Sequence, residues 1–170
     1  MSARYARIGY LGLGSNVGDR AAHLRAAVGL LGERGVEVEA ISSAYETEPV
    51  GEILDQPDFL NAVVRIRTSL APLALLDVCK AVEAERGRQP GGPRHSPRSL
   101  DVDVLLLGRV ELLNDRLTLP HPEVTRRSFV LIPLLELDPA LALPDGTSLA
   151  EASERLGAER VERAGALMEL

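Results

Sequence analysis

The order of strand-like and helix-like stretches is the feature of this chain that most constrains its fold. Residues 36–47, 59–68 and 100–107 alternate apolar and polar residues with the period of two that is typical of strands with one buried face. Residues 4–15 carry tyrosine and aliphatic residues and end in glycines, which predicts a first strand that runs into a turn. Apolar residues recur at helical spacing in residues 19–34 and 69–87. The sequence therefore predicts the order strand, helix, strand, strand, helix, strand.

This order is that of the split βαβ unit of ferredoxin-like domains, and it predicts an α+β fold with helices packed on one side of an antiparallel sheet. We expect Asp19 and Ser69 to cap the two helices at their N-termini. A C-terminal hairpin that turns at Gly108, and helices after it, are expected to extend the unit. The chain shows no internal repeat or linker, so residues 1–170 are interpreted as a single domain.

Charge and composition exclude several classes of protein. The net charge of −6 argues against a protein that coats nucleic acid with its whole surface. Cys79 is the single cysteine, so no intrachain disulfide can form. No stretch is long and apolar enough for a membrane span. The N-terminus does not show the charged start followed by an apolar run that is typical of a signal peptide. The cytoplasm is therefore the expected compartment.

The predicted strand at residues 100–107 carries two acids on one face. Its apolar face is predicted to consist of Leu100, Val102, Val104 and Leu106. Asp101 and Asp103 then stand side by side on the other face, roughly 7 Å apart, where their charges repel each other. Oxygen ligands at this separation suit one or two Mg²⁺ ions. For an Asp-x-Asp pair alone, a solvent-facing strand with two charges is the more common alternative.

The stretch that precedes these acids favours the metal site. It contains only basic charges, broken by glycines and prolines, and these basic residues are Arg86, Arg88, Arg94, His95 and Arg98. A basic loop that leads into a dicarboxylate strand provides metal on one side and guanidinium groups on the other, as phosphoryl transfer requires. The two halves together therefore indicate a phosphate site.

Two further places carry candidate binding residues. Phe59 and Asn61 fall together on the outer face of their strand, where a Phe can stack on a flat ring and an amide can bind the ring edge. Half-buried packing is an equal alternative for Phe59. His121 lies between two prolines, which restrict its backbone, and Arg127 and Phe129 follow on a short predicted helix. These neighbours favour a ligand site over an ordinary turn.

The glycine-rich run from Gly12 to Asp19 does not match a nucleotide-binding loop. Its spacing misses G-x-G-x-x-G, and no Lys follows the last glycine as a phosphate-binding loop would need. The run is interpreted as a turn between a strand and a helix.

With these stretches in place, the chain resembles the 6-hydroxymethyl-7,8-dihydropterin pyrophosphokinase family from Tyr10 to about Gly146. The resemblance rests on short motifs in the same order along the chain. They are Leu13-Gly-Ser-Asn, Ser42-Ser-Ala-Tyr-Glu-Thr-Glu-Pro-Val-Gly, Asp55-Gln-Pro-Asp-Phe-Leu-Asn, Gly87-Arg, Pro97-Arg-Ser-Leu-Asp-Val-Asp-Val and Leu117-Thr-Leu-Pro-His-Pro.

The resemblance implies a Mg²⁺-dependent transferase of folate biosynthesis. Such an enzyme moves a diphosphate from ATP to the hydroxymethyl group of 6-hydroxymethyl-7,8-dihydropterin and releases AMP. Asp101 and Asp103 would hold two Mg²⁺ ions. The groups that contact the phosphates and the nucleotide would be Glu83, Arg88, Arg94, Arg98, Arg116, Thr118, His121 and Arg127, among which Arg88 and Arg98 are expected to be catalytic. The implied pterin-binding residues are Thr47, Pro49 and Val50 through their main chain, and Phe59, Asn61 and Phe129 through their side chains. The partners are small molecules, with no nucleic acid, membrane or obligate protein partner.

Three positions depart from the family pattern. His95-Ser96 stands where members often have Trp-Gly, and Pro90 stands where they often have Arg. Phe59 replaces a stacking Tyr used by some members. The first two changes alter the contacts of the basic loop.

Two rival classes remain open at this point. An RNA-binding ferredoxin-like module would stack bases on sheet aromatics, but Asp101 and Asp103 would repel its phosphates in the absence of metal. A two-metal nuclease or polymerase-like palm also uses paired acids, but it needs a long basic groove that the acidic balance does not favour.

Overall fold

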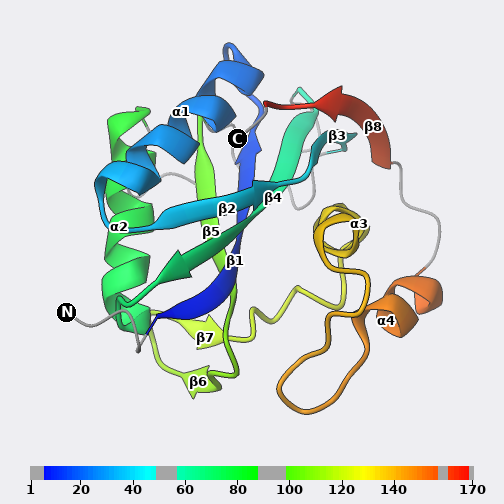
Figure 1. The fold of residues 1–170 in the computed structure, drawn as a ribbon. Coiled ribbons are helices and arrows are strands. Elements are labelled where there is room, and N and C mark those ends of the chain that lie inside the picture. The colour runs from blue at the N-terminus through cyan, green and yellow to red at the C-terminus, as the bar shows by residue number, and fades with distance from the viewer. Residues whose placement is uncertain (1–5, 49–56, 88–98, 157–160, 169–170) are drawn as a thin grey trace.

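The computed structural model describes residues 6–48, 57–87, 99–156 and 161–168 (Figure 1). The helices are α1 (Arg20–Glu33), α2 (Pro72–Glu85), α3 (Ser128–Leu137) and α4 (Leu149–Arg155). The strands are β1 (Arg7–Ser15), β2 (Glu37–Ile41), β3 (Ser43–Thr47), β4 (Phe59–Thr68), β5 (Asp101–Leu107), β6 (Leu112–Leu113), β7 (Thr118–Leu119) and β8 (Val161–Ala166).

Most of the strands form one antiparallel sheet. The hydrogen-bonded order is β5-β1-β4-β3-β8, and β2 pairs with β4 beside β3, while β6 and β7 form a separate hairpin. The central pair β1 and β4, flanked by β5, places the three longest strands next to one another. The predicted α+β fold with a ferredoxin-like antiparallel sheet is confirmed.

The two helices of the predicted unit lie on one side of the sheet as expected, and the later helices cover its other face. In Figure 1, α1 and α2 lie on one side of the sheet, and α3 and α4 lie on the other. Leu11 and Leu13 of β1 belong to the apolar cluster under α1 and α2, while Tyr10 belongs to the cluster with Leu131 and Leu134 of α3. The residues after Gly108 therefore supply a second layer.

A β-bulge corrects the predicted faces of β5. The pairing of β5 with β1 shifts between Tyr10, which lies opposite Leu106, and Leu11, which lies opposite Val104. Leu105 is thus the extra residue, and an extra residue reverses the alternation beyond it. Val102 and Val104 lie in the cluster under α1 and α2 as predicted, but Leu106 lies in the opposite cluster.

A second irregularity divides the strand predicted at residues 36–47 into β2 and β3. Between them, the Ser42 N–H donates to the Val63 carbonyl, and the Ser42 hydroxyl accepts from the Val63 N–H, both at 2.9 Å. The side chain therefore replaces a main-chain acceptor and shifts the register against β4 by one residue.

The predicted caps of the first two helices have different outcomes. Asp19 caps α1, because its carboxylate accepts from the Ala22 N–H at 3.1 Å. Ser69 does not cap α2: the N-cap is Ala71, without a side-chain hydrogen bond, and Pro72 supplies the preset first turn. The hydroxyl of Thr68 instead accepts from the Leu70 N–H at 3.2 Å, which forms a turn before the helix.

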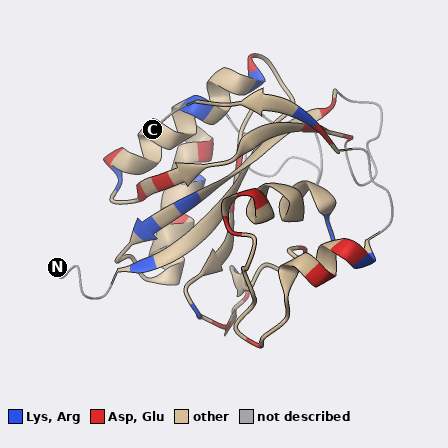
Figure 2. Cartoon of the chain, turned by 45° about the vertical axis from the view of Figure 1, so that its right-hand side comes forward, with Lys and Arg blue, Asp and Glu red and all other residues tan. Residues whose placement is uncertain are grey.

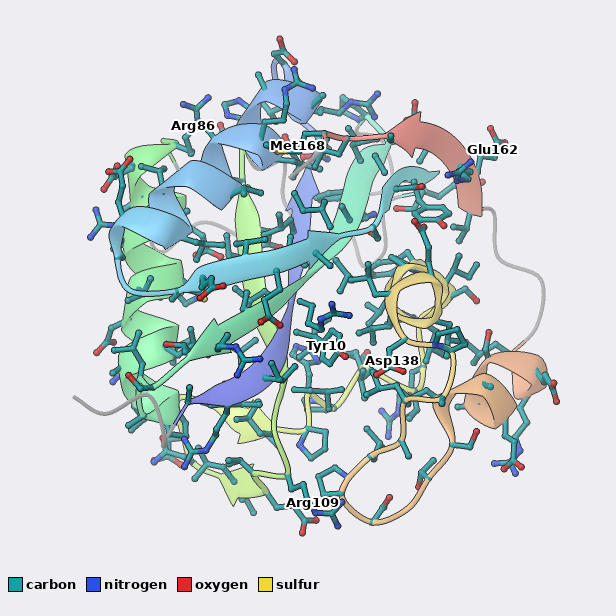
Figure 3. All side chains as sticks on the ribbon, in the orientation of Figure 1. Tyr10, Arg86, Arg109, Asp138, Glu162 and Met168 are labelled. Atoms are coloured by element: carbon teal, nitrogen blue, oxygen red, sulfur yellow. The ribbon has the colours of Figure 1, made fainter. Side chains whose placement is uncertain are left out.

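The C-terminal part of the chain contacts the sheet at the end of α3 and through strand β8. The Tyr10 hydroxyl donates to Asp138 Oδ2 at 3.1 Å at the end of α3 (Figure 3). Burial, followed by this hydrogen bond, raises the pKa of Tyr10 to about 12. β8 pairs with β3 and so extends the sheet with a strand that the sequence did not predict. In the part of the chain that the structure describes, no helix has the length and apolar character to cross a membrane.

Candidate active site

A pocket of about 440 Å³ lies between the sheet and the segment that leads into α3. Its walls come from elements far apart in the sequence. They include Gly12 and Gly14 of β1, Thr47 of β3, Phe59 and Asn61 of β4, Lys80 of α2, Asp101 and Asp103 of β5, His121 and Glu123 of the following loop, and Arg127 and Phe129 at α3. The cavity is therefore a product of the tertiary fold.

Glycines of β1 form the floor of this pocket. Gly12 pairs with Asp103 of β5, and Gly14 lies between Asn61 of β4 and Asp101 of β5. Because neither glycine carries a side chain, the acids on one neighbouring strand and the amide on the other face each other across bare main chain.

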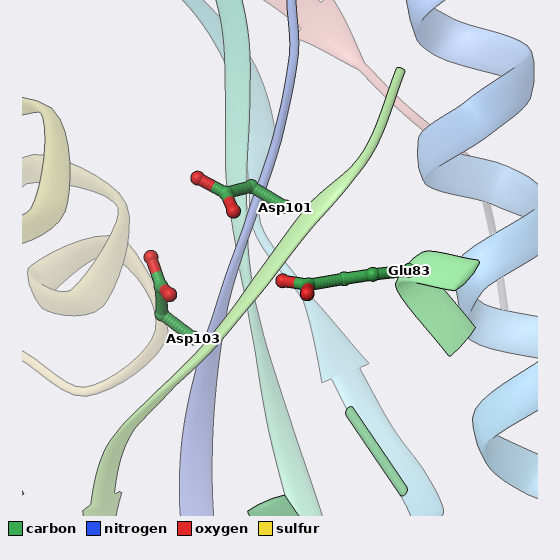
Figure 4. A group of neighbouring side chains, drawn as sticks. All are labelled: Glu83, Asp101 and Asp103. Carbon is green, nitrogen blue, oxygen red and sulfur yellow. The ribbon is translucent and has the colours of Figure 1, made fainter. Parts of the chain in front are cut away.

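Three carboxylates gather at one end of the pocket, which we call the carboxylate end (Glu83, Asp101 and Asp103). One carboxylate oxygen from each lies within 4.8 Å of the other two. In Figure 4 the two Asp side chains leave one side of β5, and Glu83 approaches that strand from α2. Three acids this close repel one another in the absence of a cation.

The position of Glu83 follows from the edge of the sheet. β5 is an edge strand, so its Val102 N–H points away from β1 and needs an acceptor. Glu83 Oε2 accepts from this N–H at 2.8 Å, and the residue is only 2% exposed. Lys80 Nζ lies 3.5 Å from Glu83 Oε1. The donor set of hard oxygens fits a divalent cation such as Mg²⁺.

A histidine, His121, and an arginine, Arg127, line the same pocket as these acids. His121 Nδ1 accepts from the Glu123 N–H at 3.0 Å, so the ring proton lies on Nε2. Burial lowers the pKa of His121, and the nearby Glu123 and Asp101 carboxylates oppose this effect. Arg127 Nη2 lies 3.2 Å from Glu123 Oε1. A neutral imidazole donor and a held guanidinium thus border the pocket.

Four uncharged residues, Thr47, Phe59, Asn61 and Phe129, form the other end of the pocket. We call it the aromatic end. Phe59 lies opposite Thr47 in the pairing of β3 with β4, and Phe129 lies in the first turn of α3. The Asn61 side-chain amide donates to Thr47 Oγ1 at 2.6 Å. Two rings and an amide at one end of a cavity suit a flat, polar-edged ligand.

The pocket collects most of the predicted site residues that the structure describes. Its lining contains Thr47, Phe59, Asn61, Asp101, Asp103, His121, Arg127 and Phe129. Glu83 joins the carboxylate end from behind β5. Arg116 and Thr118 are not among the lining residues: Arg116 forms an exposed ion pair with Asp77, and Thr118 begins β7. Pro49, Val50, Arg88, Arg94 and Arg98 lie outside the described residues, as do Pro90 and His95.

Sequence reasoning did not find several residues that line the pocket, notably Gly12, Gly14, Lys80 and Glu123. Strand alternation places the two glycines on the face of β1 that lies opposite Leu11 and Leu13, so their position could have been found. Lys80 lies one helical turn before Glu83, and side chains at this spacing are neighbours on a helix, so its place beside Glu83 could also have been predicted.

Comparison with known proteins gives a consistent result. The family model described as 7,8-dihydro-6-hydroxymethylpterin-pyrophosphokinase (HPPK) matches residues 10–139. The chain is 46% identical over 157 residues to the 2-amino-4-hydroxy-6-hydroxymethyldihydropteridine pyrophosphokinase of Methylorubrum extorquens, covering 90% of this chain and 98% of that protein.

Longer relatives contain the same region as one part. The chain is 45% identical over 127 residues to the folate synthesis bifunctional protein of Arabidopsis thaliana, which covers 75% of this chain but only 26% of that protein. A crystal structure of Plasmodium falciparum HPPK-DHPS with pterin and p-hydroxybenzoate superposes with a TM-score of 0.66 at 17% identity, over 88% of this chain and 42% of that one. This last similarity shows the fold alone.

Proposed function

Since the chain belongs to the 7,8-dihydro-6-hydroxymethylpterin-pyrophosphokinase family, we propose that it transfers diphosphate from ATP to the hydroxymethyl group of 6-hydroxymethyl-7,8-dihydropterin in folate biosynthesis. The products are the pterin diphosphate and AMP. One observation carries this proposal: a single pocket joins a cluster of three carboxylates to two aromatic rings and an amide.

The aromatic end is the proposed pterin site. Phe59 and Phe129 stack on the two faces of the ring, and the Asn61 amide hydrogen-bonds its edge. Thr47, Pro49 and Val50 offer main-chain groups, although the last two are assigned on their motif alone. Stacking between two rings fixes the plane of the pterin, and the amide fixes its rotation in that plane.

The carboxylate end is the proposed phosphate site. Asp101 and Asp103, with Glu83 beside them, would hold Mg²⁺, which we propose as two ions and which neutralises charge on the phosphate oxygens when bound. His121 donates through Nε2, and Arg127 offers its guanidinium to the nucleotide. Arg88, Arg94, Arg98, Arg116 and Thr118 complete the proposed nucleotide site on the strength of their motifs.

The bare floor of β1 explains how the two ends work together. The pterin hydroxymethyl oxygen attacks the β-phosphorus of ATP, and the bond from that phosphorus to the oxygen that stays with AMP breaks. No side chain of β1 stands between Asn61 on β4 and the acids on β5, because Gly12 and Gly14 occupy this face. The reaction needs position and charge neutralisation more than a strong side-chain base.

The distribution of charge supports small-molecule substrates over nucleic acid. In Figure 2, basic and acidic residues both occur along the described ribbon, and the basic residues seen in this view do not form a band that runs the length of the sheet. A nucleic-acid groove needs such a band. We further propose that residues 1–170 act as one domain and that the cytoplasm is the compartment.

The decisive experiment is to incubate the protein with ATP, Mg²⁺ and the reduced pterin and to identify the nucleotide product. We expect AMP and the pterin diphosphate, and neither in the presence of a chelator. ADP with a pterin monophosphate would indicate an ordinary kinase and contradict the proposal. Mg²⁺-independent binding of a single-stranded RNA, without any transfer, would support the binding module instead.

A further inference from the structure

The side chain of Thr47 holds the amide of Asn61. Asn61 Nδ2 donates to Thr47 Oγ1 at 2.6 Å, a short hydrogen bond for a neutral pair. Thr47 is only 3% exposed, so water does not compete well for its hydroxyl. In the register of β3 with β4, Thr47 lies opposite Phe59 and diagonal to Asn61 on the same face. The bond therefore fixes the amide relative to the ring of Phe59.

Gly14 supplies the space on the opposite side of the same amide. It lies directly across from Asn61 in the pairing of β1 with β4. A Cβ at Gly14 would lie 2.8 Å from Asn61 Oδ1 and 3.6 Å from Phe59 Cδ1. The first distance is shorter than a Cβ can accept, so any side chain at this position displaces the amide. Asn61 is thus held by Thr47 and accommodated by Gly14.

This arrangement defines what the amide presents to the pocket. Nδ2 carries two hydrogens and uses one on Thr47, which leaves one N–H and the carbonyl oxygen. A group that is locked in this orientation complements a ring edge with an adjacent donor and acceptor. If the amide were free to rotate about its last torsion, part of its binding energy would be lost as entropy.

We infer that Thr47, through its hydroxyl, and Gly14, through its missing side chain, are positioning residues that set pterin recognition by Asn61. The inference rests on the proposed function. It gives Thr47 a second role, distinct from the main-chain contact implied by its motif, and it gives Gly14 a role in recognition.

The test compares Thr47→Val, which keeps shape and main chain, with Thr47→Ser, which keeps the hydroxyl. Pterin affinity is measured by titration without nucleotide, and KM values for pterin and for ATP are measured with Mg²⁺. We expect Thr47→Val to weaken pterin binding roughly five- to tenfold, with the KM for ATP unchanged. Thr47→Ser is expected to stay within about twofold of the wild type. Gly14→Ala is expected to weaken pterin binding in the same direction.

Thr68→Val is the matched control, because Thr68 is equally buried on β4 at 3% and its hydroxyl donates to the Gly35 carbonyl at 3.1 Å, outside the pocket. We expect it to lower stability but to leave pterin affinity unchanged. An equal loss of pterin affinity in Thr68→Val would overturn the inference, because the effect would then be general destabilisation.

A double-mutant cycle shows whether Thr47 acts through Asn61. In an Asn61→Ala background, Thr47→Val should cause no further loss of pterin affinity, and an undiminished loss overturns the inference. If the wild type binds pterin and Thr47→Val binds it equally well, only this inference falls. If the wild type fails to bind pterin at all, the proposed function falls and takes the inference with it.

Discussion

At the aromatic end of the pocket, neutral side chains from neighbouring strands pack and hydrogen-bond to one another, whereas at the carboxylate end three acids share a small volume. The Asn61 amide already has its partner in Thr47. Of the cations that line the pocket, Arg127 pairs with Glu123, and Lys80 Nζ lies 3.5 Å from Glu83 Oε1. The aromatic end is thus held by contacts between neutral groups, while the carboxylate end gathers three acids in a way that suits a cation.

A carboxylate of α3 also holds the aromatic end in place, because it binds α3 to β3. Glu136 of α3, the helix that carries Phe129, accepts from the Tyr45 hydroxyl at 2.5 Å and from the N–H and hydroxyl of Ser43 at 2.9 and 3.1 Å. Arg163 of β8 donates to the Ser43 hydroxyl at 2.7 and 3.0 Å. Because these contacts fix α3 to β3, they also fix the part of the chain that carries the Phe129 ring.

The comparison predicts that loss of a charge at the carboxylate end has the largest effect. In Asp103→Asn we expect kcat to fall by roughly 10³-fold or more, because a metal ligand supplies several kcal/mol of charge stabilisation in the transition state. Steady-state formation of AMP measures this loss. Pterin affinity without nucleotide should stay at the wild-type value, because the aromatic end does not depend on the acids.

The same variant has a simple control. Asp115→Asn removes an identical charge from an exposed position outside the pocket lining, and it should leave kcat unchanged. Turnover near the wild-type rate in Asp103→Asn would remove Asp103 from the metal site.

A smaller effect is expected from the aromatic end. Phe129→Ala should weaken pterin affinity by about 1 to 3 kcal/mol, the scale of losing one stacked ring. Its affinity for ATP with Mg²⁺ should not change. Calorimetric titration with each substrate separates the two, and Phe129→Leu, which keeps apolar volume without a stacking face, should fall between. Unchanged pterin affinity in Phe129→Ala would show that this ring does not contact the substrate.

The anchor behind the aromatic end should appear in the pH dependence of stability. Burial acts to raise the pKa of Glu136, but hydrogen bonds from Tyr45 and Ser43 and the charge of Arg163 outweigh it, so the net pKa is lowered. A lowered carboxyl pKa contributes stability above the unfolded value near 4.5 and loses it as the pH falls through the folded value. Acid should therefore loosen α3 from β3.

Glu136→Gln tests this sign. At pH 7 we expect the variant to be less stable by about 1 kcal/mol, because a partly exposed charged acceptor is replaced by a neutral one. The difference from the wild type should shrink as the pH falls below 4.5. Urea unfolding at a series of pH values from 7 to 3 measures it. Parallel curves for the two proteins over this range would contradict the lowered pKa.

Strict periodicity explains which parts of the site could be predicted from the sequence. Phe59 and Asn61 on β4, and Asp101 and Asp103 on β5, follow an alternation of two that continues without interruption up to these residues. The prediction for Leu106 was wrong because a bulge at Leu105 leaves no mark in an all-leucine run. Alternation locates a face only as far as the next irregularity.

Contacts between distant residues could not be predicted in the same way. Tyr45 and Glu136 are separated by 91 positions, and nothing in either local pattern indicates the other. The pairing of β8 with β3 is similar, since the sequence after residue 156 has no clear strand signal. Motif resemblance identified the residues at the pocket because it carries tertiary information, whereas propensity and spacing carry only local information.

The smallest predicted effect concerns how the carboxylate end acquires positive charge. Arg116 is held by Asp77 of α2, and both side chains are more than half exposed, at 53% and 63%. If Arg116 turns to the nucleotide, Asp77 competes with ATP for it, and an exposed ion pair is worth about 0 to 1 kcal/mol. Asp77→Asn should thus tighten ATP binding by about twofold, and Arg116→Ala should weaken it.

Calorimetric titration at low and physiological salt measures the ATP affinity of both variants. The gain in affinity from Asp77→Asn should shrink with salt, because screening already weakens the Arg116–Asp77 pair. Equal ATP affinity in Arg116→Ala and the wild type would leave Arg116 as a surface ion pair of α2, and the carboxylate end would then draw its positive charge from other residues.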